Sequence, residues 1–427
     1  MRNEIRFGLC AALMATGLTA QAETVAVSAA KLVDVANGKV IEHPVVVIED
    51  ERIIAVGPAG SVAIPAGAKR IDLPNLTLLP GLIDMHVHLT AEPTIGGYNG
   101  LLYTDSFWPI VGTRNARKTL DAGFTSVRNV GSGHFDDVGL RQAIDEHFIP
   151  GPRITTATYA LSATGGHCDE TYFPPSMNQT SPAVGDSPDE LRQKVRWVHK
   201  YGATVIKVCV SGGVFDHGAS VGAQQLNLEE IKAITDEAHM EGLKVAAHAH
   251  GTAAIADAIR GGIDTIEHSS LIDAAGIELA KEKGAYLSMD IYNTDYTQAE
   301  GKKNGELEEN LRKDREIGDA QRENFKKAVK AGVKMIFGTD AGVYPHGDNA
   351  KQFAVMVRYG MTPLQAIQAA TVTAAKALDQ EKNVGQIQVG KFGDIIGVSG
   401  DPLADVTTLE HVAFVMKGGE VFKNEVK

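Results

Sequence analysis

Histidine, lysine and aspartate residues recur in this sequence where an apolar run ends. His86 and His88 close the apolar run that begins at Leu78. Because residues i and i+2 of a strand point to the same face, both imidazoles can bind one metal ion. The pattern H-x-H is common by chance, and a lone buried histidine is usually a core residue, so the indication of a metal site rests on repetition along the chain. Further polar residues that end apolar runs are Lys207, His248, His268 and Asp340.

Lys207 is unusual among these residues because it lies between Ile206 and Val208 in an apolar strand. Burying an ammonium group there costs desolvation free energy, and its charge would repel metal ions. Such a lysine needs either an acidic partner at the rim of a barrel or a chemical modification. Carboxylation of the amine by carbon dioxide would give an anion that can bridge two divalent cations.

Strands and helices alternate between residues 77 and 377, and they are the elements that must position these side chains. The sequence contains about eight strand–helix units, the number that closes a parallel barrel. The polar residues lie at the carboxyl ends of the strands, the face on which barrel enzymes keep their active sites. Ser187 to Glu190 predicts a helix start with a capping box, and the charged run from Glu306 to Arg322 predicts a solvated helix face.

Short β-like runs without a helical period fill residues 24 to 79 and return after residue 395. Because chain ends often lie close together, we expect the two sets to pair in one small β module. The chain of 427 residues is 44% hydrophobic and 22% charged, as in globular proteins. Its formal net charge of -12 argues against binding to nucleic acid or to an anionic membrane and suits a small-molecule enzyme.

The first residues have the order of a secretory signal peptide. Arg2 and Arg6 precede an apolar run, and small residues end the segment at Ala22. We expect cleavage after Ala22 and an exported protein, periplasmic in a Gram-negative source. The chain has 3 cysteines, which are too few for a disulfide scaffold. Cys209 lies in an apolar strand and is predicted to be a core residue, and no thiol nucleophile is expected.

Five stretches of the sequence carry a resemblance to a known family: 78–88, 338–340, 362–363, 369–371 and 385–394. In these stretches the chain resembles members of the amidohydrolase superfamily. The resemblance implies an α/β fold, a (β/α)8 TIM-like barrel with a small composite β-sandwich module. The expected domains are the signal peptide 1–22, the β module 23–79 plus 384–427, and the barrel 80–383. Relatives that assemble also imply a homo-oligomer.

The resemblance further implies a site with two divalent metal ions, zinc by default. Two ions that share a water lower its pKa enough to supply hydroxide near neutral pH, and one ion polarises the amide carbonyl. Asp340 would take the proton and pass it to the leaving nitrogen. His250 faces the same way as His248 and competes for its role, and only the family pattern favours His248. The implied ligands are His86, His88 and Asp340 for one ion, His248 and His268 for the other, and Lys207 as the bridging carbamate.

Two loops resemble one branch of the superfamily, at residues 163–169 and 210–214. That branch contains Xaa-Pro dipeptidase-like enzymes, carboxypeptidase-like hydrolases of N-acyl amino acids and ochratoxin-hydrolysing amidohydrolases, whose substrates carry a free carboxylate. We expect hydrolysis of a peptide-like amide bond. His167 is a candidate donor to the oxyanion or contact to the substrate, or else a loop histidine bonded to Asp169. The candidates for the substrate carboxylate are His217, Arg128 and Tyr344.

Two other functions stay open. The mononuclear branch of the superfamily deaminates substrates or opens cyclic amides and lactones, but a single-metal site does not need Lys207 as a bridge. A non-catalytic metal-binding or peptide-binding protein could use the same fold. The complete ligand set with Asp340 argues against that function.

Overall fold

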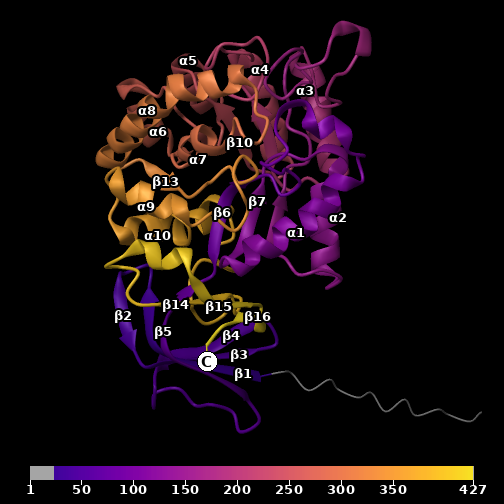
Figure 1. Ribbon diagram of the computed structural model, residues 1–427. Helices are drawn as coiled ribbons and strands as arrows, with labels where there is room; N and C mark the ends of the chain where they lie inside the picture. The colour runs from indigo at the N-terminus through magenta and orange to yellow at the C-terminus, as the bar shows by residue number, and fades with distance from the viewer. Residues whose placement is uncertain (1–23, 427) are drawn as a thin grey trace, which may run out of the picture.

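The computed structural model describes residues 24–426 and shows two parts (Figure 1). A β sheet built from both ends of the chain lies at one end of the molecule, and parallel strands surrounded by helices form the larger part. The expected signal peptide, residues 1–22, lies outside the described residues. Within the described part of the chain, no helix is long and apolar enough to span a lipid bilayer.

The terminal sheet has the strand order β16-β15-β14-β5-β1-β3-β4, with β2 paired to β1. Strand β5 joins the two ends of the chain, because it pairs in parallel with β1 and antiparallel with β14. A small core of its own stabilises this sheet, with Val27, Leu78 and Phe414 fully buried. The strands are β1 (Thr24–Asp34), β2 (Lys39–Glu42), β3 (Pro44–Glu49), β4 (Arg52–Pro58), β5 (Lys69–Pro80), β14 (Ile395–Ser399), β15 (Val412–Lys417) and β16 (Glu420–Asn424).

The chain leaves this sheet at Gly81. The apolar run that begins at Leu78 does not form one continuous strand, because β5 ends at Pro80 and a new strand, β6, begins at Leu82. A Cβ atom at position 81 would lie 2.0 Å from the Thr125 hydroxyl oxygen, so only glycine fits there. Residues 77–80 therefore belong to the terminal sheet, and an apolar run alone does not reveal this break.

The larger part contains parallel strands in sheets of three and five, ordered β6-β7-β8 and β9-β10-β11-β12-β13. Backbone hydrogen bonds join the sheets at both edges: Leu161 donates to Lys207 at 2.8 Å, and Asp340 donates to His86 at 2.7 Å. The carboxyl ends of all these strands thus open toward one region. The strands are β6 (Leu82–Val87), β7 (Phe124–Asn129), β8 (Arg153–Thr156), β9 (Ile206–Cys209), β10 (Val245–Ala249), β11 (Thr265–His268), β12 (Tyr286–Ser288) and β13 (Lys334–Ile336).

Helices surround these strands on the outside (Figure 1). The predicted cap at Ser187 is present, since its hydroxyl accepts from the Glu190 amide, but the Glu190 side chain accepts from Asp186 rather than from Ser187. The helices are α1 (Phe107–Asp121), α2 (Asp136–Asp145), α3 (Pro188–Lys200), α4 (Leu228–Met240), α5 (Thr252–Arg260), α6 (Ala274–Lys283), α7 (Asn293–Glu300), α8 (Glu308–Ala331), α9 (Lys351–Arg358), α10 (Pro363–Ala369) and α11 (Val372–Ala377), with 3-10 turns η1 (Gly97–Leu102), η2 (Gly133–Phe135), η3 (Pro175–Met177) and η4 (Val406–Glu410).

The prediction that the charged run in α8 forms only a solvated face is wrong. Lys313 and Asp314 on this helix are buried, at 2% and 6% exposure. Lys313 reaches across to Asp216 on the loop after β9, with 2.6 Å between its ammonium and the carboxylate. A buried ion partner on another element explains why a lysine tolerates this position.

Candidate active site

One cavity of about 280 Å³ opens at the carboxyl ends of the parallel strands. Its lining includes every residue that the sequence predicted as a metal ligand. Strands β6, β9, β10 and β11 and the loop after β13 supply these side chains, so residues far apart in the chain meet in one place. The predicted ligands that line the cavity are His86, His88, Lys207, His248, His268 and Asp340.

The first group of donor atoms comes from His86, His88 and Asp340. The Asp340 Oδ1 atom lies 3.3 Å from His86 Nε2 and 3.2 Å from His88 Nε2. The other ring nitrogens point away from this oxygen: His86 Nδ1 lies 2.9 Å from Glu267 Oε2, and His88 Nδ1 lies 3.2 Å from the Gly131 carbonyl oxygen. Because those contacts hold the Nδ1 protons, both Nε2 atoms are free to bind a cation.

The second group contains His248, His250 and His268, whose ring nitrogens converge within 4.8 Å. His268 Nδ1 lies 3.0 Å from Asp290 Oδ1. The buried His248 Nε2 has no hydrogen-bond partner among residues 24–426. Buried polar atoms rarely lack a partner, so this nitrogen fits a metal ligand. In contrast, His250 Nδ1 contacts the Ser270 hydroxyl at 2.8 Å, which leaves its Nε2 as a competing donor.

Lys207 is 3% exposed and lines the same cavity as both groups. Burial lowers the pKa of its ammonium to about 8, although the carboxylates of Glu267 and Asp340 oppose this shift. The neutral amine is therefore accessible near neutral pH. Only a neutral amine has the lone pair that reacts with carbon dioxide.

The backbone is strained at two of the predicted ligands. His268 and Asp340 adopt positive φ angles of 66° and 59°, in the left-handed region that L residues rarely occupy. Such conformations persist when surrounding contacts hold them, and they concentrate at functional sites. Strand β11 ends at His268. The turn there gives the His268 side chain a different direction from that of the neighbouring Glu267, which is fully buried.

Glu267 links a metal-ligand candidate to Arg128. The Arg128 guanidinium contacts Glu267 Oε1 at 2.7 Å and also donates to the Met85 carbonyl and the Thr265 hydroxyl. Burial raises the pKa of Glu267, but Arg128 and His86 outweigh it and hold that pKa well below its usual range. Since Arg128 is 1% exposed and its donors are occupied, it supports His86 through Glu267 instead of contacting a substrate carboxylate.

The other substrate-binding candidates are also placed away from the cavity. Tyr344 is fully buried against Tyr292, and burial raises the pKa of its phenol well above the usual value. His217 is exposed and bonds to Glu309 at 2.8 Å. Neither residue lines the cavity, so their proposed contact with a substrate carboxylate finds no support in this geometry.

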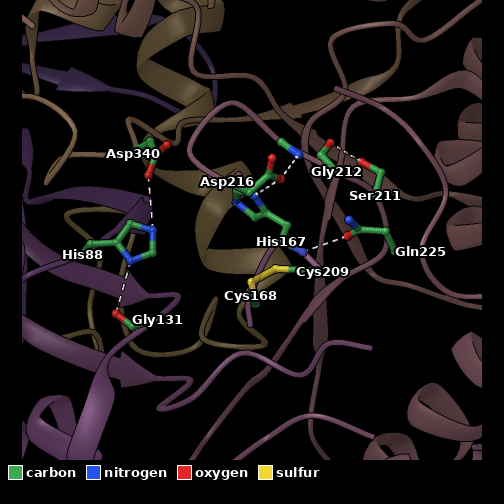
Figure 2. The surroundings of a disulfide bond; sticks show 11 residues. His88, Gly131, His167, Cys168, Cys209, Ser211, Gly212, Asp216, Gln225 and Asp340 are labelled. Atoms are coloured by element: carbon green, nitrogen blue, oxygen red, sulfur yellow. Dashed lines mark hydrogen bonds and ion pairs between the residues drawn. A yellow bond between two sulfur atoms is a disulfide. The ribbon is translucent and has the colours of Figure 1, made fainter. Parts of the chain in front are cut away.

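His167 does line the cavity, beside the predicted second metal site. Its ring stacks on His248, with 3.9 Å between ring centroids and 14° between planes. Its Nδ1 lies 2.9 Å from Asp216 Oδ2 (Figure 2), so the bonding partner is Asp216 rather than the expected Asp169. Burial raises the pKa of Asp216, but His167, the Gly213 amide and Lys313 lower it to about 2. The ionised carboxylate thus accepts from Nδ1 and leaves His167 Nε2 for the cavity.

A disulfide joins Cys168 to Cys209 in the same region, with 5.9 Å between their Cα atoms (Figure 2). Cys209 is fully buried in the core, as expected, but its disulfide was not predicted from the sequence. Both cysteines line the cavity, and 41 residues separate them in the chain. The pairing depends on how a long loop returns to β9, which a count of cysteines does not show.

Several supporting residues escaped the sequence analysis. Asp290 follows β12 and lines the cavity. Burial raises the pKa of its carboxyl, but His268 outweighs burial and holds that pKa below the usual value. It had the same sequence signal as Asp340, a carboxylate directly after an apolar run. Glu267, Asp216 and Lys313 gave no comparable signal, because their roles depend on contacts between distant elements.

Parallel strands that present histidine, lysine and aspartate from their carboxyl ends are typical of α/β enzymes that use metal ions in hydrolysis. The sequence profile described as "Amidohydrolase family" matches residues 77–422. The chain belongs to the amidohydrolase family, which confirms the resemblance seen in the sequence.

Individual relatives agree with this assignment. The ochratoxinase of Aspergillus niger is 33% identical over 418 residues, covering 91% of this chain and 84% of the relative. Its crystal structure matches with a TM-score of 0.83 and covers 95% of this chain and 96% of its own. A Xaa-Pro dipeptidase with bound methionine in the active site matches with a TM-score of 0.87 and 34% identity, over 94% of this chain and 100% of the other. A prolidase complexed with N-methylphosphonate-L-proline matches with a TM-score of 0.86 and 32% identity, over 94% and 100%.

Proposed function

We propose that this protein is a binuclear metal-dependent amidohydrolase on a (β/α)8 barrel, which releases the C-terminal amino acid from dipeptides or N-acyl amino acids. The observation that carries the proposal is the convergence of two groups of donor atoms and Lys207 in one cavity. Relatives described as ochratoxinase, Xaa-Pro dipeptidase and prolidase support an amide bond as the target.

The donor set suits two divalent cations. His86, His88 and Asp340 would hold one ion, and His248 and His268 the other. Lys207 would bridge them as a carbamate formed with carbon dioxide. Imidazole and carboxylate donors accept zinc and several other divalent ions, and zinc is our default. Bound there, the ions would lower the pKa of a water molecule and polarise a substrate carbonyl.

The chain's own residues then supply positioning and proton transfer. Burial opposes ionisation of Asp340, but His86 and His88 hold the pKa of its carboxyl well below the usual value. Asp340 is therefore ionised and can accept a proton from the attacking water and pass it to the leaving nitrogen. His167, fixed by Asp216, presents Nε2 to the cavity. Burial lowers the pKa of this imidazole, so the neutral ring accepts a hydrogen bond at Nε2, and it donates to the developing oxyanion only after it gains a proton there.

We also propose that the protein is exported and works as a homo-oligomer. The signal-like start of the sequence supports export. A disulfide beside the cavity supports an oxidising compartment such as the periplasm.

The proposal is tested by measuring amino-acid release from a panel of dipeptides and N-acyl amino acids that differ at the C-terminal residue and include ochratoxin A. We expect release that a chelator abolishes and added zinc restores. If protein with two metal ions per chain releases no amino acid from any substrate, the proposal fails, and the deaminase and cyclic amide or lactone hydrolase branches become the better candidates.

A further inference from the structure

The loop that carries His167 is long, and its first part is bonded to β9, since the Leu161 amide donates to the Lys207 carbonyl and the Leu161 carbonyl accepts from the Cys209 amide. It runs from the end of β8 at Thr156 to the start of α3 at Pro188. Asp169 is its internal anchor, since its carboxylate accepts hydrogen bonds from the Gly165 amide, the Ser181 amide and the Thr180 hydroxyl. These bonds give the loop its shape, but they do not attach the His167 turn to a strand.

Two hydrogen bonds attach His167 to the neighbouring loop. Its amide donates to Gln225 Oε1 at 2.9 Å, and its Nδ1 contacts Asp216. Both partners lie between β9 and α4, so one loop is held by another (Figure 2). Loops are the less stable parts of a fold, so these contacts hold His167 against the loop after β9 without joining it to a strand.

The disulfide attaches the same turn to a strand. Cys168, the residue after His167, is bonded to Cys209, the last residue of β9. In the parallel register Cys209 lies opposite His248 on β10, the residue on which the His167 ring stacks. Both Cys209 and β10 are fully integrated in the core, and the Cys209 amide donates to the Leu161 carbonyl at 2.8 Å.

We propose that the Cys168–Cys209 disulfide is a positioning element for catalysis, which fixes the His167 imidazole over the metal site. This inference rests on the proposed amide hydrolysis and on the role of His167 in it. In this role the disulfide takes part in no chemical step, either at the metal ligands or at the leaving group. It acts through the adjacent residue, His167. Closing the loop covalently removes conformations in which His167 lies away from His248.

The primary test replaces both cysteines, as Cys168→Ala/Cys209→Ala, and compares metal-loaded variant and wild-type protein. A displacement of about 1 Å of a catalytic group can cost on the order of a hundredfold in rate. We expect kcat to fall by about tenfold or more. We expect KM to change less than kcat and the metal content to stay at two ions per chain. Amide hydrogen exchange of residues 163–169 should become faster, while exchange in β9 and β10 stays the same.

Thr180→Ala is the matched control on the same loop. It removes the hydrogen bond from the Thr180 hydroxyl to Asp169 and leaves the disulfide in place. We expect faster hydrogen exchange near residue 180 with kcat unchanged. An equal fall in kcat for Thr180→Ala would show that any loosening of the loop has the same effect and would overturn the specific role of the disulfide.

A double-mutant cycle separates positioning of His167 from a general structural role. In a His167→Ala background, loss of the disulfide should change kcat by less than about twofold, because the group that it positions is absent. A loss equal to that in wild-type protein would overturn the inference. Unchanged kcat and unchanged exchange in the cysteine variant would overturn it as well.

Two further measurements keep the test decisive. If the alanine variant does not fold, Cys168→Ser/Cys209→Ser and wild-type protein reduced after folding, with metal content measured again, provide the same comparison. If wild-type protein releases no amino acid from any amide substrate, the proposed function fails. The exchange of residues 163–169 still shows whether the disulfide fixes the His167 turn, so the two failures are distinguishable.

Discussion

At the scale of single residues, the cavity is organised by the ring nitrogens that face away from it. His86, His88 and His268 each use Nδ1 for a contact with an oxygen atom, of Glu267, Gly131 and Asp290 respectively. Such contacts fix the tautomer and the ring orientation of a histidine ligand and raise its basicity. The Nε2 atoms are thus prepared for cations before any ion binds.

Replacing Lys207 and Asp340 should separate metal binding from proton transfer. In Lys207→Ala the bridging group is absent, so we expect loss of at least one metal ion per chain and loss of activity by more than about a thousandfold. In Asp340→Asn an amide oxygen can still contact a cation, but the proton acceptor is gone, so activity should fall with most metal retained. Metal analysis of each purified variant, together with amino-acid release, checks both outcomes.

Added short carboxylic acids provide the control for Lys207→Ala, because they can occupy the space of the missing carbamate. Partial recovery of metal and activity would support a bridging anion at this position. Full metal content and full activity in Lys207→Ala would contradict the binuclear site.

The residues that end apolar runs could be predicted from the sequence, because strand ends of a parallel ring meet at one face. This reasoning places His86 and Asp340 correctly in one cavity. It could not place Arg128, since a charged residue in a strand gives no sign of whether its partner is a substrate or a buried Glu267. The sequence also left His248 and His250 as competitors, and the structure places ring nitrogens of both in the same group with His268.

At the scale of elements, helix α8 supports the cavity through its buried face. Lys313 on α8 holds Asp216, and Asp216 holds His167, so a helix outside the strands sets the orientation of a cavity residue. The sequence predicted a charged helix in this region but not the burial of Lys313. A charged residue can be buried where the fold brings an ion partner from another element next to it, and the local sequence does not show this.

Lys313→Met should destabilise the protein by about 3 kcal/mol, because it leaves the Asp216 carboxylate buried without its partner. Asp216 has a folded pKa of about 2, below its unfolded pKa of about 3.9. Its contribution to stability is therefore present above pH of about 4 and is lost as the pH falls toward 2. Without Lys313 the folded pKa of Asp216 rises, and acid unfolding should begin at higher pH. Urea unfolding between pH 3 and pH 7 measures both effects.

Lys326→Met is the matched substitution for this experiment, because Lys326 is an exposed lysine on the same helix. We expect its unfolding free energy and its acid sensitivity to equal those of wild-type protein. Equal destabilisation by both substitutions would show that the loss of a helix lysine, rather than of the bond to Asp216, is responsible.

At the scale of the whole molecule, strand β5 ties the ends of the chain to the parallel strands. It pairs with β1 and β14 and then continues through Gly81 into β6, which carries His86. Pairing between the ends could be predicted from strand-like runs alone. The break at Gly81 could not, because it depends on a side chain from β7 that approaches the backbone.

Removing the metal ions should destabilise the whole molecule, and the metal-free protein should lose stability further as the pH falls. Ions that bind only the folded protein stabilise it by about 2.7 kcal/mol when their free concentration is a hundred times Kd. In the metal-free protein, burial and the neighbouring histidines hold the pKa values of His248 and His250 well below the usual value. Below pH of about 6.5 the unfolded chain therefore binds more protons than the folded one, and stability falls as the pH falls.

The measurement is urea unfolding of chelator-treated and zinc-reloaded protein at pH 7.5, 6.5 and 5.5. We expect a higher midpoint with zinc at pH 7.5, and a falling midpoint for the metal-free protein between pH 6.5 and 5.5. Protons compete with cations for the same imidazoles, so the advantage of zinc should shrink over that interval as well. Identical midpoints with and without zinc at pH 7.5 would contradict a metal site in this cavity. The candidate ligands come from strands of both sheets, so ions bound there must oppose separation of the two sheets.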